Sequence, residues 1–142
     1  MTPDNRRKLR DLITNSEGYK QFPYTDTTGH LTIGIGRNLT DRGIFLNEAI
    51  EMLDNDVTYF TDWLSNNLEF FPELNDVRQM VMISMCFNLG VKGILDFKKM
   101  IDALANKDYD TAANEILDSK ARHQTGDRYE KLADMMRTGE LS

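Results

Sequence analysis

The sequence is poor in the residues that carry metal, redox or disulfide chemistry: it has one cysteine and two histidines among 142 residues. With Cys86 alone the chain cannot form an internal disulfide, and its neighbours Met85 and Phe87 favour a buried, inert thiol over a nucleophile. His30 and His123 are not supported by cysteines or acids at metal-ligand spacing. We therefore expect neither a metal site nor a cofactor.

Positive charge is also scarce, because 17 Lys and Arg face 23 Asp and Glu, for a formal net charge of −6. Nucleic-acid binding needs clustered Lys and Arg, so no nucleic-acid partner is expected. The N-terminal segment 1–12 is basic, but no long apolar run follows it. We therefore expect no signal peptide and no direct membrane insertion.

The first half of the chain carries two helix patterns with clear ends. A helix is expected over 2–16, with Pro3 at its first position and Gly18 just past its end. A second, long amphipathic helix is expected over about 47–66, because its apolar residues recur every three or four positions. Asn47 is the expected N-cap of this helix.

The second half predicts a buried helical core. The segment 75–89 is apolar nearly all round, which is typical of a central helix, and Gly90 is the expected stop. Three shorter helices are expected near 94–104, near 109–117 and from 125 to a stop at Gly139. At this length we expect a single folding unit.

Between the first two helices lies a hairpin pattern. The turn residues 26–29 (Asp-Thr-Thr-Gly) precede a segment in which three aliphatic residues alternate with Thr32, Gly34 and Gly36. The aliphatic residues are Leu31, Ile33 and Ile35. We expect them to pack inward, which leaves a second face with bare backbone where a ligand can lie close.

Two acids flank this hairpin on different elements. Glu17 falls in the last turn of the first helix, where the negative end of the helix dipole favours a protonated carboxyl group. Asp26 begins the hairpin turn, and Thr32 follows on the next strand. Two carboxyl groups on rigid elements are what glycosidic bond cleavage requires, although taken alone both acids could be ordinary surface charges.

The pattern as a whole resembles the phage lysozyme family (glycoside hydrolase family 24), and within it the T-even type. The matching motifs are Glu17-Gly18, Tyr24-Thr25-Asp26 and Gly29-His30-Leu31-Thr32-Ile33-Gly34-Ile35-Gly36. The resemblance implies that Glu17 is the general acid, Asp26 the second carboxylate and Thr32 a residue that places a water. We expect substrate contacts from Leu31, Gly34, Phe87 and Asn88, although Asn88 is explained nearly as well as a polar residue at a helix end.

The resemblance also implies supporting contacts. Asp56 would pair with Arg37, which stands where the family has a histidine. The segment around Gln124 resembles the family's Gln-Thr-Pro-x-Arg motif, with glycine in place of the proline, and implies that Arg128 pairs with Glu17.

The implied fold is a mainly helical α+β lysozyme-like domain over 1–142. It would consist of a hairpin lobe at about 16–45 with a reduced sheet, a connecting helix at about 47–66, and a helical lobe at about 67–142 that includes helix 2–16.

The implied activity is a metal-free, inverting muramidase that cleaves the β-1,4 bond between N-acetylmuramic acid and N-acetylglucosamine in peptidoglycan. As a phage or prophage endolysin it would be a monomer that waits in the host cytoplasm until a holin-type protein gives it access to the periplasm and cell wall. The alternatives are hydrolysis of a related glycan such as chitin, and a non-catalytic glycan-binding or virion structural protein.

Overall fold

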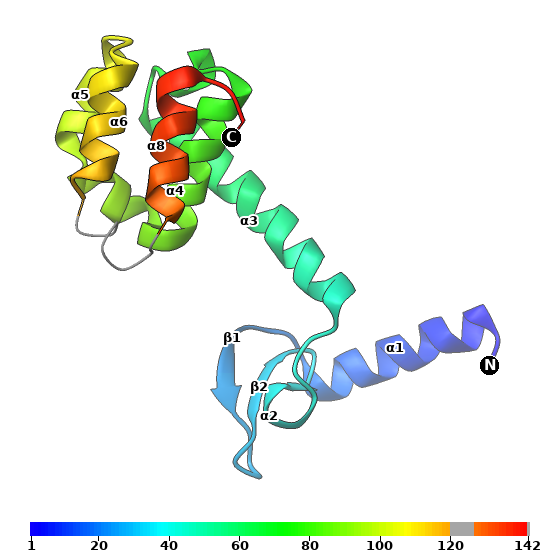
Figure 1. The fold of residues 1–142 in the computed structure, drawn as a ribbon. Coiled ribbons are helices and arrows are strands. Elements are labelled where there is room, and N and C mark those ends of the chain that lie inside the picture. The colour runs from blue at the N-terminus through cyan, green and yellow to red at the C-terminus, as the bar shows by residue number, and fades with distance from the viewer. Residues whose placement is uncertain (120–126, 142) are drawn as a thin grey trace. The chain divides into compact units, whose positions relative to one another are not determined.

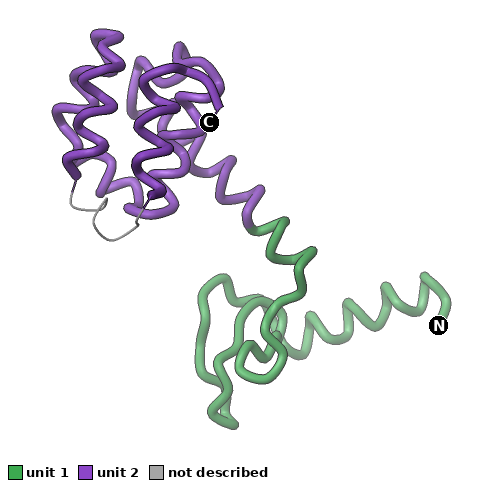
Figure 2. The backbone as a smooth tube through the Cα atoms, in the orientation of Figure 1, with its two compact units in different colours: residues 1–52 green, residues 53–142 purple. Residues whose placement is uncertain are grey.

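A computed structural model describes residues 1–119 and 127–141, so Gln124 lies outside the described residues. The described chain is mostly helical with one small antiparallel sheet, which confirms the mainly helical α+β class (Figure 1). It divides into two compact units, residues 1–52 and 53–142 (Figure 2). The expectation that helix 2–16 packs with the helical lobe concerns how the units meet, and it stays a prediction.

The first unit opens with α1 (Pro3–Glu17). Thr2 is its N-cap, and the Thr2 hydroxyl accepts a hydrogen bond from the backbone N–H of Asn5 at 3.2 Å. Gly18 follows the last helical residue with a φ of +70° and donates its N–H to the carbonyl of Thr14. Both predicted ends are therefore confirmed, and Glu17 is the final residue of the helix.

Three short strands follow, paired antiparallel in the order β1 (Lys20–Thr25), β2 (Leu31–Gly34) and β3 (Arg37–Asn38). In this register Tyr24 lies opposite Thr32. The sheet therefore holds the predicted hairpin and one further short strand.

The prediction that the aliphatic face of β2 packs inward is wrong. Thr32 is 4% exposed and is the most buried side chain of residues 1–52, whereas Leu31 and Ile35 are each 46% exposed. The hydroxyl of Thr32 donates to the carbonyl of His30 at 3.0 Å, which satisfies the buried polar group. Period two distinguishes the two faces of a strand but does not say which of them is covered.

The chain leaves the sheet through a four-residue helix, α2 (Leu39–Arg42), that the sequence did not predict. The long helix α3 (Leu46–Asn67) begins before Asn47, so Asn47 is not its N-cap. Glu48 accepts a hydrogen bond from the N–H of Phe45 at 2.8 Å, which is one half of a capping box. The boundary between the two units falls within α3, after Met52.

The second unit consists of helices around one core. After the short 3-10 helix η1 (Phe71–Glu73) come α4 (Asp76–Asp96), α5 (Lys98–Ala105), α6 (Tyr109–Leu117) and α8 (Arg128–Thr138). Asn75 caps α4, and Gly90 interrupts its helical geometry with φ +72° and ψ 168°, after which the helix resumes. The predicted break at Gly90 is therefore confirmed, with a further helical segment beyond it.

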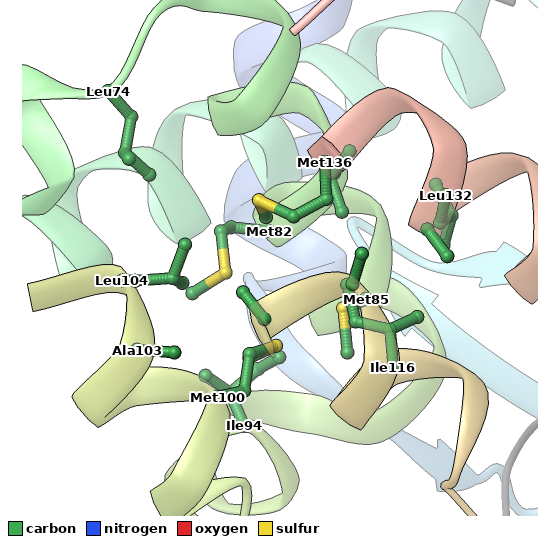
Figure 3. Packing of buried hydrophobic residues seen from close by; sticks show 14 of the residues in the cluster. Leu74, Met82, Met85, Ile94, Met100, Ala103, Leu104, Ile116, Leu132 and Met136 are labelled. Atoms are coloured by element: carbon green, nitrogen blue, oxygen red, sulfur yellow. The ribbon is translucent and has the colours of Figure 1, made fainter. Parts of the chain in front are cut away.

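The core of this unit is rich in methionine (Figure 3). Met82 and Met85 from α4, Met100 from α5 and Met136 from α8 are fully buried. Their flexible thioethers fill irregular gaps between helices. Cys86 is buried among them, which confirms the predicted burial, and this burial raises the pKa of its thiol to about 11.

One arginine ties α4 to the end of α8. Arg78 donates from Nε to the carbonyl of Met136 at 2.7 Å and from Nη2 to the carbonyl of Arg137 at 3.0 Å. Its guanidinium also stacks over the ring of Tyr109 at 3.6 Å from the centroid. These contacts satisfy carbonyl groups that the last helical turn leaves without partners inside the helix.

Within the described residues, no single helix is long and apolar enough to span a membrane. The bent pair formed by α4 and α5 meets the length and composition criteria, as the buried core helices of other proteins also do.

Candidate active site

The Asp26 carboxylate is held by its own turn. Its Oδ1 accepts three hydrogen bonds: from the Thr28 N–H at 2.9 Å, from the Thr28 hydroxyl at 2.8 Å and from the His30 N–H at 2.8 Å. The His30 N–H, then the Thr28 hydroxyl, hold the pKa of Asp26 below its ordinary value. The result is an ionised carboxylate with one oxygen anchored, and Oδ2 is the oxygen it can offer to a ligand or water.

Thr32 lies diagonally across the hairpin from Asp26, which follows the last residue of β1. It pairs with Tyr24, two residues before Asp26, and the pairing continues into the turn because the Asp26 N–H donates to the His30 carbonyl at 2.9 Å. Alternate residues of a strand share a face, so the Thr32 and Asp26 positions share one face of the hairpin. Since the Thr32 hydroxyl gives its proton to the His30 carbonyl, it can serve any further partner only as an acceptor.

Glu17 packs against the backbone of Gly36. A Cβ atom on Gly36 would lie 3.0 Å from Cγ, Cδ and Oε2 of the Glu17 side chain. Gly36 therefore makes room for the Glu17 side chain. Its φ of +68° also favours glycine at this position. The sequence also predicted that these glycines leave room for a ligand. A Cβ on Gly34 would meet no atom within 4 Å, so the space beside Gly34 is open.

Replacing Gly36 with alanine should both destabilise the first unit and weaken activity. The left-handed conformation alone costs an L-residue about 1–2 kcal/mol, and the new methyl group must also displace the Glu17 carboxyl. Gly43→Ala is the matched control, because Gly43 also has a positive φ, of +55°, but a Cβ there meets no atom within 4 Å. Chemical denaturation and wall-lysis rates would separate strain, shared by both variants, from displacement of Glu17. Equal lysis rates for the two variants would refute the predicted displacement.

Comparison with known proteins decides the family. The phage lysozyme family model matches residues 14–137, which contain all the candidate residues of both units. The chain belongs to the phage lysozyme family. It is 26% identical to two probable T4-type lysozymes of Dictyostelium discoideum, numbered 1 and 2, over 94% of this chain and 96% and 95% of theirs. It is also 25% identical to the pre-baseplate central spike protein of Enterobacteria phage T4, over 99% of this chain but 29% of that protein.

Family membership makes this protein a lysozyme-like glycan hydrolase, and therefore a glycoside hydrolase. The hairpin unit of this phage lysozyme family member holds Glu17, Asp26 and Thr32, the three positions singled out by the sequence motif. Their individual roles remain predictions.

Arg37 has a partner within its own unit, whereas its predicted pair with Asp56 joins the two units and stays a prediction. Arg37 makes a two-pronged contact with Glu48, from Nη1 to Oε1 at 2.9 Å and from Nη2 to Oε2 at 2.7 Å, and it also donates to the carbonyl of Gly43. Arg37 therefore links the sheet to the first turn of α3, where Glu48 also caps Phe45.

We expect a double-mutant cycle of Arg37→Ala and Glu48→Gln to show coupling, and the same cycle with Asp56→Ala tests the predicted pair across the units. The Arg37 guanidinium, then the Phe45 N–H, lower the pKa of Glu48 from its ordinary 4.5. The stabilisation is thus present above pH 4.5 and lost as the pH falls through the lowered value. Urea unfolding of wild type and Glu48→Gln across this range measures it, and a stability difference that grows on acidification would contradict the pairing.

The candidate residues of the second unit have partners of their own. Asn88 is exposed, and its Oδ1 accepts a 2.8 Å hydrogen bond from the hydroxyl of the buried Tyr129, which fixes the amide orientation. Phe87 is 41% exposed and packs edge-on against Phe60, with ring centroids 5.0 Å apart. Neither contact tests substrate binding, so both assignments stay predictions.

Arg128 donates from Nη2 to the carbonyl and the hydroxyl of Ser84, at 3.0 and 3.1 Å. The predicted pair between Arg128 and Glu17 joins the two units and stays a prediction. Among the residues that the structure describes, no group of three or more His, Cys, Asp or Glu side chains is arranged to hold a metal ion.

Sequence reasoning missed two neighbours of Asp26. Thr28 stands two residues after an aspartate at the start of a turn, which is the spacing of an Asx-turn, so its contact could have been predicted. His30 lies inside the matched motif and was considered only as a metal ligand. Its imidazole contacts Thr28 in the same turn and Asp41 on α2. The second contact joins residues eleven positions apart, and no local spacing predicts it.

Proposed function

We propose that this protein is a muramidase that cleaves the β-1,4 bond between N-acetylmuramic acid and N-acetylglucosamine in peptidoglycan, acting as a phage or prophage endolysin. The observation that carries the proposal is the anchored Asp26 carboxylate, with one oxygen held by three donors, in a chain of the phage lysozyme family. Glu17 at the end of α1 is the proposed general acid. It protonates the leaving oxygen as the glycosidic bond breaks.

Asp26 and Thr32 together suit the placement of a water. Asp26 offers Oδ2 as an acceptor, and Thr32 offers the lone pairs of a hydroxyl whose proton is already donated to His30. A water between them gives one O–H to each and directs its own lone pair at the anomeric carbon. The water's proton passes to Asp26 as the new C–O bond forms, so no covalent glycosyl-enzyme is needed.

We predict inversion at the anomeric carbon, which a direct attack of water produces. The first product then carries an α-configured reducing end, observable by early-time proton NMR before mutarotation. Inverting enzymes keep their two carboxyl groups about 6.5–9.5 Å apart, whereas retaining enzymes need about 5 Å. Initial accumulation of the β-anomer, or a trapped covalent adduct on Asp26, would contradict this mechanism and leave the glycosidase assignment intact.

The test of the activity is hydrolysis of purified peptidoglycan, followed by mass spectrometry of the soluble fragments. Fragments that end in reducing N-acetylmuramic acid support the proposal. Fragments with reducing N-acetylglucosamine would identify a different bond, and chitin oligomers used in parallel test the related-glycan alternative. No release from either substrate would refute glycan hydrolysis by this chain alone.

A second role is favoured by one observation, the 25% identity to the pre-baseplate central spike protein of phage T4 along almost the whole chain. We infer from it the alternative that the domain serves in a virion, either cleaving the wall during entry or only binding it. Mass spectrometry of purified particles distinguishes the roles, because an endolysin is found in the lysate and a virion protein in the particle.

The endolysin proposal includes its surroundings. A protein of this kind waits in the host cytoplasm as a monomer and reaches the periplasm and cell wall after a holin-type protein opens the inner membrane. The net charge of −6 does not favour adhesion to an anionic wall, so recognition would depend on contacts from residues such as Leu31, Gly34, Phe87 and Asn88 to the sugars.

A further inference from the structure

The imidazole of His30 stands between two acids. Its Nδ1 lies 2.6 Å from the Thr28 hydroxyl, and its Nε2 lies 3.3 Å from Oδ2 of Asp41 on α2. Its Nδ1 also lies 3.8 Å from Oδ1 of Asp26. Asp26 from the turn and Asp41 from α2 are the charged groups that the structure places within 4 Å of the ring. The ring is thus tied to the same hydroxyl that holds Asp26.

The hydroxyl of Thr28 has one proton to share between two partners. When it donates to Asp26 Oδ1, His30 must contribute an N–H from Nδ1, and the Asp41 carboxylate, 3.3 Å from Nε2, favours a second N–H there by its charge. That state is the imidazolium. A neutral ring that keeps its N–H toward Asp41 presents a bare Nδ1, which takes the Thr28 proton and leaves Asp26 with two donors in place of three.

We propose that His30 is a positioning residue for Asp26. Through the Thr28 hydroxyl, His30 sets whether Oδ1 of Asp26 accepts three hydrogen bonds or two. Protonated His30 directs the hydroxyl to Asp26 and keeps this carboxylate anchored, and neutral His30 with its one proton on Nε2 withdraws it. The inference rests on the proposed role of Asp26 as general base.

The test is the pH titration of the Asp26 carboxyl carbon by NMR, followed together with the His30 ring signals. The wild-type Asp26 signal should show a second inflection at the pH where His30 titrates. Thr28→Val should lose that inflection and move the Asp26 titration to higher pH, because it removes one donor. Thr28→Ser keeps a hydroxyl and should restore the wild-type curve, which also guards against a fold defect in the valine variant.

Asp41→Asn is the second arm. It removes the carboxylate beside Nε2, so the His30 ring signals and the second Asp26 inflection should move together. A wild-type Asp26 curve without a second inflection, or one that Thr28→Val leaves unchanged, would overturn the proposal. The acid limb of the lysis profile should shift upward in Thr28→Val and not in Thr28→Ser. If the protein fails to cleave peptidoglycan, the NMR coupling still decides the inference by itself.

Discussion

Glu17→Gln should lower the rate of peptidoglycan cleavage by about 10²–10⁴-fold, the range that a positioned general acid contributes. The amide keeps the shape of the side chain against Gly36 but has no acidic proton to give to the leaving oxygen. Binding of glycan fragments should be nearly unchanged, so the loss falls on kcat. Turbidity loss of outer-membrane-permeabilised cells and release of soluble fragments both measure it.

The matched control is Glu51→Gln, an exposed glutamate on α3 in the same unit. It changes the net charge by the same amount and should leave the rate near wild type. The thermal stability of Glu17→Gln should equal or exceed that of the wild type, since active-site groups are commonly placed at a cost to stability. A Glu17→Gln protein that clears cell walls at the wild-type rate would show that another group supplies the proton.

The largest stability effect is expected at Arg78. Arg78→Met keeps much of the aliphatic stem but removes two charge-assisted hydrogen bonds to the end of α8 and the stack on Tyr109. Hydrogen bonds from charged groups contribute about 1.5–3 kcal/mol each in favourable cases and cation–π contacts about 0.5–2 kcal/mol. Because these terms are not additive, we expect a loss of about 2–4 kcal/mol in the free energy of unfolding of the second unit.

Two further variants isolate the cause. Arg78→Lys keeps the charge but has a single compact donor group, so it should recover only part of the loss. Arg137→Met removes an exposed ion pair with Asp110 near the same helix end and should cost less than about 1 kcal/mol. Urea unfolding followed by tryptophan fluorescence, which reports on Trp63 of this unit, ranks the variants. Equal losses at Arg78 and Arg137 would mean that net charge matters more than the carbonyl contacts.

Features set by neighbouring residues could be predicted from the sequence. Gly18 and Gly139 end their helices, and Asn75 begins one, because each acts on backbone groups within a few residues of itself. The motif from Glu17 to Gly36 likewise indicates the family through residues that follow one another closely, and the family model confirms it. Each of these signals acts between residues that are close to one another in the sequence.

Features decided between elements could not be predicted in the same way. Arg37 pairs with Glu48 because the start of α3 places this carboxylate at its guanidinium, a contact between elements that no local spacing signals. The buried face of β2 depended on what covers the sheet, and the hydroxyl of Thr32 became acceptable inside because the His30 carbonyl faces it. Neither outcome can be predicted from the spacing of apolar residues along the chain.

The methionine core also allows the rate of methionine oxidation to report how often the helices of the second unit separate. Met80 is 47% exposed on α4, whereas Met82, two residues further on, has no exposed surface. Added peroxide should oxidise the exposed Met80 at the rate of a free thioether. It reaches the buried Met82 only when the helices separate. The protein thus carries its own reference thioether beside the one that reports opening, and a sulfoxide at Met82 would set a polar, chiral group among apolar neighbours.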